Sequence, residues 1–137
     1  MLTKLTKIIA ILTLAGTLAS SAVAAPRQQS LLQAVNEVRA AHHLSPLRVN
    51  PTLARFAQRH SITMARTHVF AHALPLRFPI ASRVIGEDLA WIPGDRPAAV
   101  VAAWMASPPH RANLLSPQFR RIGIGDVNGL VTADFAA

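Results

Sequence analysis

The sequence contains no cysteine, and it has only two lysines, Lys4 and Lys7, both close to its start. Without cysteine the chain can form neither a disulfide framework, the usual staple of small secreted domains, nor a lipoprotein anchor, nor a cysteine nucleophile. A GxSxG nucleophile elbow, a Walker phosphate-binding sequence and the HExxH helix of zinc proteases are also missing. The fold must therefore be stabilised by apolar packing, or with help from a bound ion.

The start of the chain has the organisation of a secretory signal peptide. Lys4 and Lys7 precede an apolar run from Ile8 to Leu18, and Ala22 and Ala24 form a small-x-small cleavage signal. The apolar run is shorter than the roughly 20 residues that a membrane span needs. An uncleaved membrane anchor is the alternative interpretation.

Cleavage is expected after Ala24, because a cut one residue later would leave Pro26 immediately behind it. Removing these 24 of the 137 residues leaves 113, enough for one compact domain. The sequence thus predicts a signal peptide over residues 1–24 and a single domain over residues 25–137. The mature chain is expected to be secreted or periplasmic, monomeric and without a transmembrane segment.

The predicted mature chain is strongly basic, with twelve arginines against six acidic residues. Such a charge favours anionic partners, including envelope polymers, acidic lipid surfaces and nucleic acid. The arginines are scattered, however, and only Arg120 and Arg121 are adjacent. We therefore expect a solvated cationic surface. Nucleic acid is not the expected partner, because only the charge supports nucleic-acid binding.

Apolar periodicity and turn residues predict five elements. Asn50 before Pro51 is a helix-start signature, and Asn128-Gly129 is typical of a two-residue hairpin turn. Apolar spacing places Trp91 and Trp104 in the core and His60 on the apolar side of its helix, as a hydrogen-bonded core histidine. The predicted elements are a helix from Ser30 to about His42, a helix from Pro51 to about Thr67, a buried strand in "VIGEDLAWI", a helix capped by Asp95, and a hairpin formed by "RIGIGDV" and "LVTADFA".

Four short motifs occur together along the chain. They are "FAH" ending at His72, "GED" at Gly86 to Asp88, "WMASPPHRANLL" at Trp104 to Leu115, and "FRRIGIG" at Phe119 to Gly125. In order and spacing they resemble the CAP superfamily of cysteine-rich secretory, antigen 5 and pathogenesis-related proteins (SCP domain), and in particular its small, cysteine-free bacterial branch. The resemblance covers nearly the whole mature chain.

The resemblance implies an α+β fold, a three-layer α-β-α sandwich with a central antiparallel sheet. It also implies a cleft lined by two histidines and two acids. His72 and His110 match the histidine positions, and Glu87 matches the first acid. The second acid would fall at Ser107, so this copy lacks it, and Asp88 replaces the asparagine more usual after that glutamate.

Three chemical interpretations of His72, Glu87 and His110 remain open. They could form a hydrogen-bonded network that ties a loop, a strand and a helix together. The two imidazoles could bind a zinc-like ion, with Glu87 as ligand, without catalysis. A metal-dependent hydrolase would use Glu87 as the catalytic general base toward a metal-bound water.

Ser107, Asp88 and Asn113 are further cleft candidates. Ser107 is also a good capping residue for a helix that begins at Pro108. We expect the protein to act mainly by binding an envelope component, a lipid or a protein partner at the His/Glu cleft. Hydrolysis of peptide or another envelope polymer is the alternative.

Overall fold

The computed structural model describes residues 26–137. The predicted signal peptide and its cleavage site lie outside these residues. No helix within the described part of the chain is both long and apolar enough to cross a membrane. The described elements, in chain order, are α1 (Pro26–Ala41), β1 (Arg48–Val49), α2 (Pro51–Thr67), β2 (Ile85–Trp91), α3 (Pro97–Ala106), α4 (Pro108–Leu114), β3 (Arg121–Val127) and β4 (Leu130–Ala136).

The four strands form one sheet in the order β1-β3-β4-β2. The pairs β3–β4 and β4–β2 are antiparallel, as expected, whereas the short β1 runs parallel to β3 and makes the sheet mixed. Asn128 and Gly129 have φ values of 53° and 86°, as a type I′ turn requires, so the predicted hairpin is confirmed.

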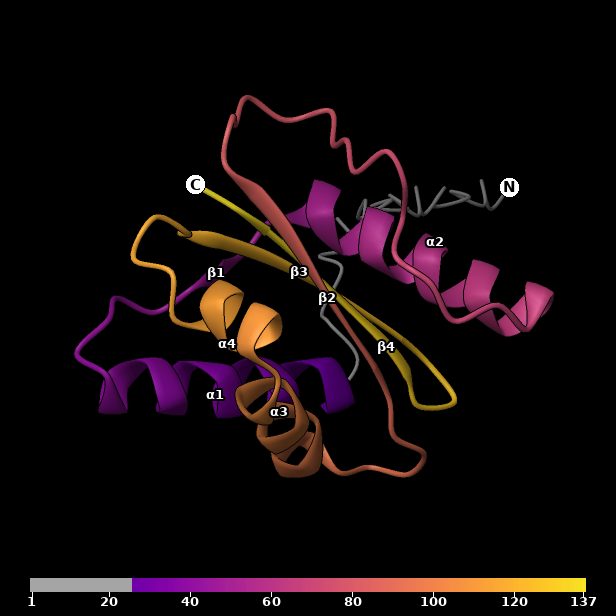
Figure 1. Ribbon diagram of the computed structural model, residues 1–137, viewed down its shortest axis with the longest axis horizontal. Coiled ribbons are helices and arrows are strands. Elements are labelled where there is room, and N and C mark those ends of the chain that lie inside the picture. The colour runs from indigo at the N-terminus through magenta and orange to yellow at the C-terminus, as the bar shows by residue number, and fades with distance from the viewer. Residues whose placement is uncertain (1–25) are drawn as a thin grey trace, which may run out of the picture.

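The sheet lies between two layers of helices, which confirms the α-β-α sandwich. Figure 1 shows α2 on one side of the sheet and α1, α3 and α4 on the other. Helix α2 lies very close to β3 because Gly123 and Gly125 have no side chains. A Cβ on Gly123 would lie 2.0 Å from the carbonyl carbon of Leu53, and one on Gly125 would lie 2.3 Å from that of Ala57.

Helix boundaries follow local chemistry. Helix α2 has its predicted bounds, and the Asn50 side chain accepts hydrogen bonds from the backbone N–H groups of Thr52 and Leu53. Helix α1 begins at Pro26, earlier than predicted, because the Ser30 hydroxyl donates to the carbonyl of Pro26 instead of capping a new helix.

Helix α3 was predicted to be capped by Asp95. Its N-cap is instead Arg96, with no capping side-chain hydrogen bond, and Pro97 opens the helix. Helix α4 begins at Pro108 as predicted, but the Ser107 side chain makes no capping hydrogen bond either.

The main apolar core lies between the sheet and the layer of α1, α3 and α4. Trp104 is 1% exposed in this core, and its indole N–H donates to the Leu89 carbonyl at 2.8 Å. The core prediction for Trp91 is wrong, since this residue is 67% exposed. Trp91 ends the edge strand β2, where an apolar residue no longer has a helix layer to cover it.

Candidate functional site

The "GED" motif lies in β2, where alternation sends successive side chains to opposite faces of the sheet. Glu87 faces the side covered by α2, and Asp88 faces the side covered by α4. Gly86 must be small, because a Cβ there would lie 2.9 Å from Oδ1 of Asn113 and 3.0 Å from the Phe119 ring. Two neighbouring acids of one motif are thus separated by the sheet itself.

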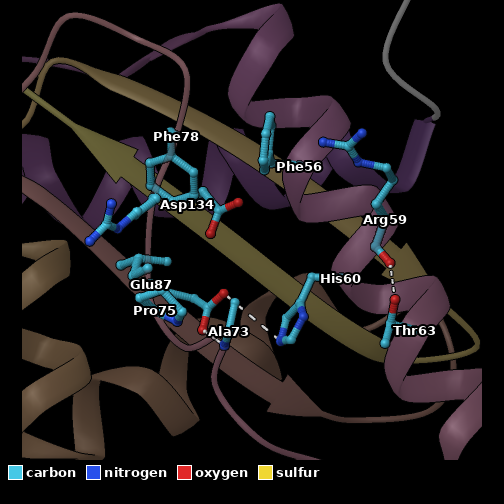
Figure 2. Close-up of a pocket in the computed structure, with 11 residues that line it drawn as sticks. Phe56, Arg59, His60, Thr63, Ala73, Pro75, Phe78, Glu87 and Asp134 are labelled. Carbon is cyan, nitrogen blue, oxygen red and sulfur yellow. Dashed lines mark hydrogen bonds and ion pairs between the residues drawn. The ribbon is translucent and has the colours of Figure 1, made fainter.

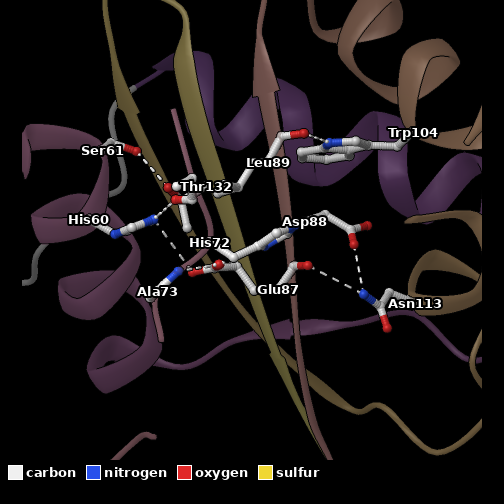
Figure 3. Close-up of polar contacts among 11 residues, drawn as sticks. His60, Ser61, His72, Ala73, Glu87, Asp88, Leu89, Trp104, Asn113 and Thr132 are labelled. Atoms are coloured by element: carbon white, nitrogen blue, oxygen red, sulfur yellow. Dashed lines mark hydrogen bonds and ion pairs between the residues drawn. The ribbon is translucent and has the colours of Figure 1, made fainter. Parts of the chain in front are cut away.

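The Glu87 carboxylate is 6% exposed and binds the segment that follows α2. His72 Nδ1 donates to its Oε1 at 2.8 Å, and the backbone N–H of Ala73 donates to the same oxygen at 2.9 Å (Figure 3). This geometry assigns a proton to Nδ1 of His72, because a carboxylate oxygen only accepts. Glu87 therefore fixes the position of His72.

His110 comes from α4 and lies beside His72. Their ring centroids are 6.1 Å apart, with an angle of 52° between the rings. Burial lowers the pKa of His110, and the neighbouring His72 lowers it further. Both causes favour the neutral imidazole, so His110 keeps one nitrogen available as an acceptor. The structure thus brings His72 next to both of the other predicted site residues.

These residues do not form a metal-binding cluster. Within residues 26–137 no group of three or more His, Cys, Asp or Glu side chains is arranged to hold a metal ion. Nδ1 of His72 donates to Glu87, so this imidazole can offer a metal only its Nε2. Together with one nitrogen of the neighbouring His110 this gives two imidazole donors, whereas an open zinc site needs three protein ligands. The donor set seen here does not fit zinc and therefore supports no metal-dependent step.

Asp88 and Asn113 pair on the opposite face of the sheet. The Asn113 amide donates to Oδ1 of Asp88 at 2.7 Å and to the Glu87 carbonyl at 3.4 Å. Burial raises the pKa of Asp88 to about 8; the Asn113 hydrogen bond opposes this shift and the charge of Glu87 adds to it. Asn113 therefore holds α4 against β2, and neither side chain shares the face of the Glu87 carboxylate. Ser107 lies half-buried at the junction of α3 and α4.

A pocket of about 250 Å³ opens on the α2 face of the sheet. Figure 2 shows Glu87 and Asp134 at this pocket from neighbouring strands, with Phe56 and His60 contributed by α2. His60 was predicted to be a hydrogen-bonded core residue. It is hydrogen-bonded, to the Ala71 carbonyl at 2.9 Å, but it lines the pocket, and its Nε2 lies 3.9 Å from Oε2 of Glu87.

Asp134 is the site residue that the sequence motifs missed. It lies directly opposite Glu87 in the β2–β4 ladder and is 1% exposed. Burial raises its pKa to about 8, with a further contribution from the charge of Glu87. The alternation of "LVTADFA" could have placed Asp134 on one face of the hairpin. Its pairing with Glu87 depends on the strand order, which no local pattern contains.

Comparison with known proteins places these features in a family. The sequence profile of the cysteine-rich secretory protein family, CAP, matches residues 32–130. The uncharacterized protein YkwD of Bacillus subtilis (strain 168) is 34% identical in an alignment of 121 positions that covers 81% of this chain and 46% of that protein. The uncharacterized membrane protein YlbC of the same organism is 27% identical over 79% of this chain and 34% of its own length. The chain therefore spans less than half of these relatives.

Solved structures give the same fold. An extracellular protein containing an SCP domain from Bacillus anthracis str. Ames superposes with a TM-score of 0.71 at 26% identity, over 79% of this chain and 39% of that one. An outer surface protein from Borrelia burgdorferi has a TM-score of 0.68 at 21% identity, over 80% and 91% of the two chains. With the family profile matched over most of its length, this chain belongs to the cysteine-rich secretory protein (CAP) family.

Proposed function

We propose that this protein is a secreted or periplasmic binding protein whose ligand is a component of the cell envelope. The site is the group formed by His72, Glu87 and His110 together with the adjoining pocket. The observation that supports this proposal most directly is Glu87 itself. One of its oxygens accepts two hydrogen bonds, while the other, Oε2, has no hydrogen-bond partner among residues 26–137.

A buried acceptor without a partner costs free energy. Such an acceptor is typical of a binding site, where a ligand supplies the missing donor. The imidazole of His72 is about half exposed, so a ligand can reach the edge of this group from solvent. Two structural relatives, one an extracellular protein and the other an outer surface protein, agree with a role outside the cytoplasm. The basic charge of the chain favours an anionic polymer surface for the first encounter.

The proposal is tested by co-sedimentation of the purified mature protein with isolated peptidoglycan. We expect retention that falls at least about tenfold in Glu87→Gln, a loss typical of one charge-assisted hydrogen bond. His72→Ala should weaken retention in the same direction because it releases Glu87. The control is Glu37→Gln, which removes one carboxylate from the exposed surface of α1.

Equal retention of Glu87→Gln and wild type would overturn this function. Parallel sedimentation with vesicles of phosphatidylglycerol and phosphatidylethanolamine separates a lipid ligand from a wall polymer. Binding to vesicles alone would contradict the choice of peptidoglycan. Elemental analysis of untagged protein before and after chelation tests the metal-dependent alternative, since stoichiometric zinc would show that the histidines rearrange to form a site.

A further inference from the structure

The floor of the pocket is a pair of buried carboxyl groups. Glu87 and Asp134 are directly opposite across the β2–β4 ladder, so their side chains extend from the same face of the sheet. They are 6% and 1% exposed. Oε2 of Glu87 and Oδ1 of Asp134 are both buried without a hydrogen-bond partner in the described part of the chain. Asp134 of β4 thus supplies a second acid on this face of the sheet.

The walls and the mouth of the pocket have a different character from its floor. Phe56 of α2 and Phe78 of the segment before β2 meet edge to face, with ring centroids 5.8 Å apart. Arg59 and Arg77 also line the pocket, and both are exposed to solvent. The guanidinium of Arg59 lies 4.3 Å from the centroid of the Phe56 ring. The pocket therefore has buried acids at its floor, aromatic rings along its side and solvent-exposed cations at its mouth. Figure 2 shows the two acids, the two phenylalanines and Arg59.

This order of groups restricts the ligand. A wholly apolar molecule would leave both floor oxygens without partners, and an anionic group at the floor would be repelled by Glu87. An ammonium group supplies up to three N–H donors and the opposite charge. Burial and Glu87 raise the pKa of Asp134 to about 8, so this carboxyl is protonated at neutral pH until a cation favours its ionised form.

A metal ion fits this floor less well than an ammonium group does. His60 is the histidine that lines the pocket, and its Nε2 lies 3.9 Å from Oε2 of Glu87. That nitrogen lies 2.9 Å from the carbonyl oxygen of Ala71, which only accepts, so Nε2 carries the proton and cannot coordinate a metal. Two carboxyl groups alone do not make the closed ligand set that zinc or calcium requires.

We propose that the pocket binds an ω-amino acid group, with the ammonium between Glu87 and Asp134, the methylene stem against Phe56 and Phe78, and the carboxylate toward the arginines at the mouth. A lysine, or another amino acid with an amine at the end of its side chain, carries this group when it stands at the carboxyl terminus of a wall peptide. The inference rests on the proposed function and deepens it, because it names the chemical group of the envelope polymer that the site recognises.

The experiment is a calorimetric titration of the purified protein with 6-aminohexanoate as the probe. Three matched probes each remove one feature: N-acetyl-6-aminohexanoate and hexanoate lack the ammonium, and hexylamine lacks the carboxylate. We expect binding of 6-aminohexanoate, about tenfold weaker binding of hexylamine, and no measurable binding of the other two. Asp134→Asn and Glu87→Gln should each weaken the binding of 6-aminohexanoate at least about tenfold. The Glu37→Gln protein should bind this probe with unchanged affinity.

Arg77→Gln should weaken the binding of 6-aminohexanoate toward that of hexylamine, because the carboxylate then loses one of its two cationic partners. The inference is overturned if 6-aminohexanoate does not bind, or if its N-acetyl derivative binds equally well. Should Asp134→Asn fail to fold, the probe series on the wild-type protein decides the question by itself. A negative titration together with Glu87-dependent retention on peptidoglycan would overturn only the inference that the pocket recognises an ω-amino acid group. The proposed function would then still stand.

Discussion

Arg39 of α1 donates a hydrogen bond to the main-chain oxygen of Leu114, at 2.7 Å, and thereby joins the first helix to the end of α4. The same guanidinium donates to the carbonyls of Ser45 at 2.9 Å and Ser116 at 3.0 Å, and Arg39 is fully buried. A charged fork surrounded by carbonyl oxygens holds together segments that are far apart in the chain.

Replacing Arg39 should therefore destabilise the fold strongly. Arg39→Lys keeps the charge but loses the planar fork, and it should reduce the free energy of unfolding by about 3 kcal/mol, because buried carbonyls lose their donors. Urea denaturation measures this change. Arg48→Lys at an exposed position is the matched control and should alter stability by no more than about 0.5 kcal/mol. Equal midpoints for the two variants would contradict the role of Arg39.

The close approach of α2 to the sheet predicts the effect of a single methyl group at Gly123. Gly123→Ala would place its Cβ within 2.0 Å of the Leu53 backbone, so α2 must move away from β3. We expect a loss of about 3 kcal/mol or more in the free energy of unfolding, at the upper end for overpacking. Ala102→Ser on the exposed face of α3 is the control. A Gly123→Ala protein as stable as the wild type would show that α2 does not need this contact.

Two buried acids should make the stability of the protein fall as the pH rises from 3.8 to about 8. The pKa values of Asp88 and Asp134 are raised in the folded state to about 8 from an ordinary value of 3.8. The folded state therefore retains protons that the unfolded chain releases. Their contribution to stability is fully present below pH 3.8. It declines as the pH rises and is lost once the pH passes the folded pKa.

The decline should amount to about 1 kcal/mol per pH unit and group. Urea denaturation between about pH 5 and pH 9 measures it. In Asp88→Asn and in Asp134→Asn the decline should be shallower than in the wild type, because each variant lacks one titrating group. A slope unchanged by either substitution would mean that these carboxyls titrate alike in the folded and unfolded chains.

The two tryptophans should respond differently to a quencher in solution. Trp91 is 67% exposed and Trp104 is 1% exposed. Iodide should quench the emission of Trp104→Phe strongly, because this variant retains the exposed Trp91, and should barely affect Trp91→Phe. Trp104→Phe should also cost about 1 to 3 kcal/mol of stability, since the Leu89 carbonyl loses its indole donor. Similar quenching of both variants would contradict the burial of Trp104.

Local chemistry made much of this fold predictable. Asn50-Pro51 and Asn128-Gly129 carry their own capping and turn geometry, so α2 and the hairpin could be located by inspection. Ser30 and Asp95 misled the prediction because a capping residue type does not ensure that its side chain caps. The core prediction for Trp91 failed because a run of apolar residues along a strand does not show where the helices that cover the sheet end.

The candidate site could be predicted only in part, because local motifs do not show which distant strands pair with each other. The motifs identified His72, Glu87 and His110, and the structure brings His72 to each of the other two. Asp134 stayed hidden because it reaches Glu87 through the pairing of two strands that are separated by more than 30 residues in the chain. That pairing is decided by how the whole sheet assembles.

The sheet separates Trp104 and Asn113 of the chain's recognisable signature from the pocket, whereas His110 of the same signature lies beside His72. Trp104 and Asn113, both within "WMASPPHRANLL", pack against the face that carries Asp88. The pocket is built on the other face, and its aromatic walls come from α2 and the segment before β2. In evolutionary terms the packing residues of the signature and the aromatic walls of the pocket can vary separately. Substitutions at positions such as Phe56 or Phe78 can change what is bound without disturbing the signature, so relatives that share "WMASPPHRANLL"-like segments need not share a ligand.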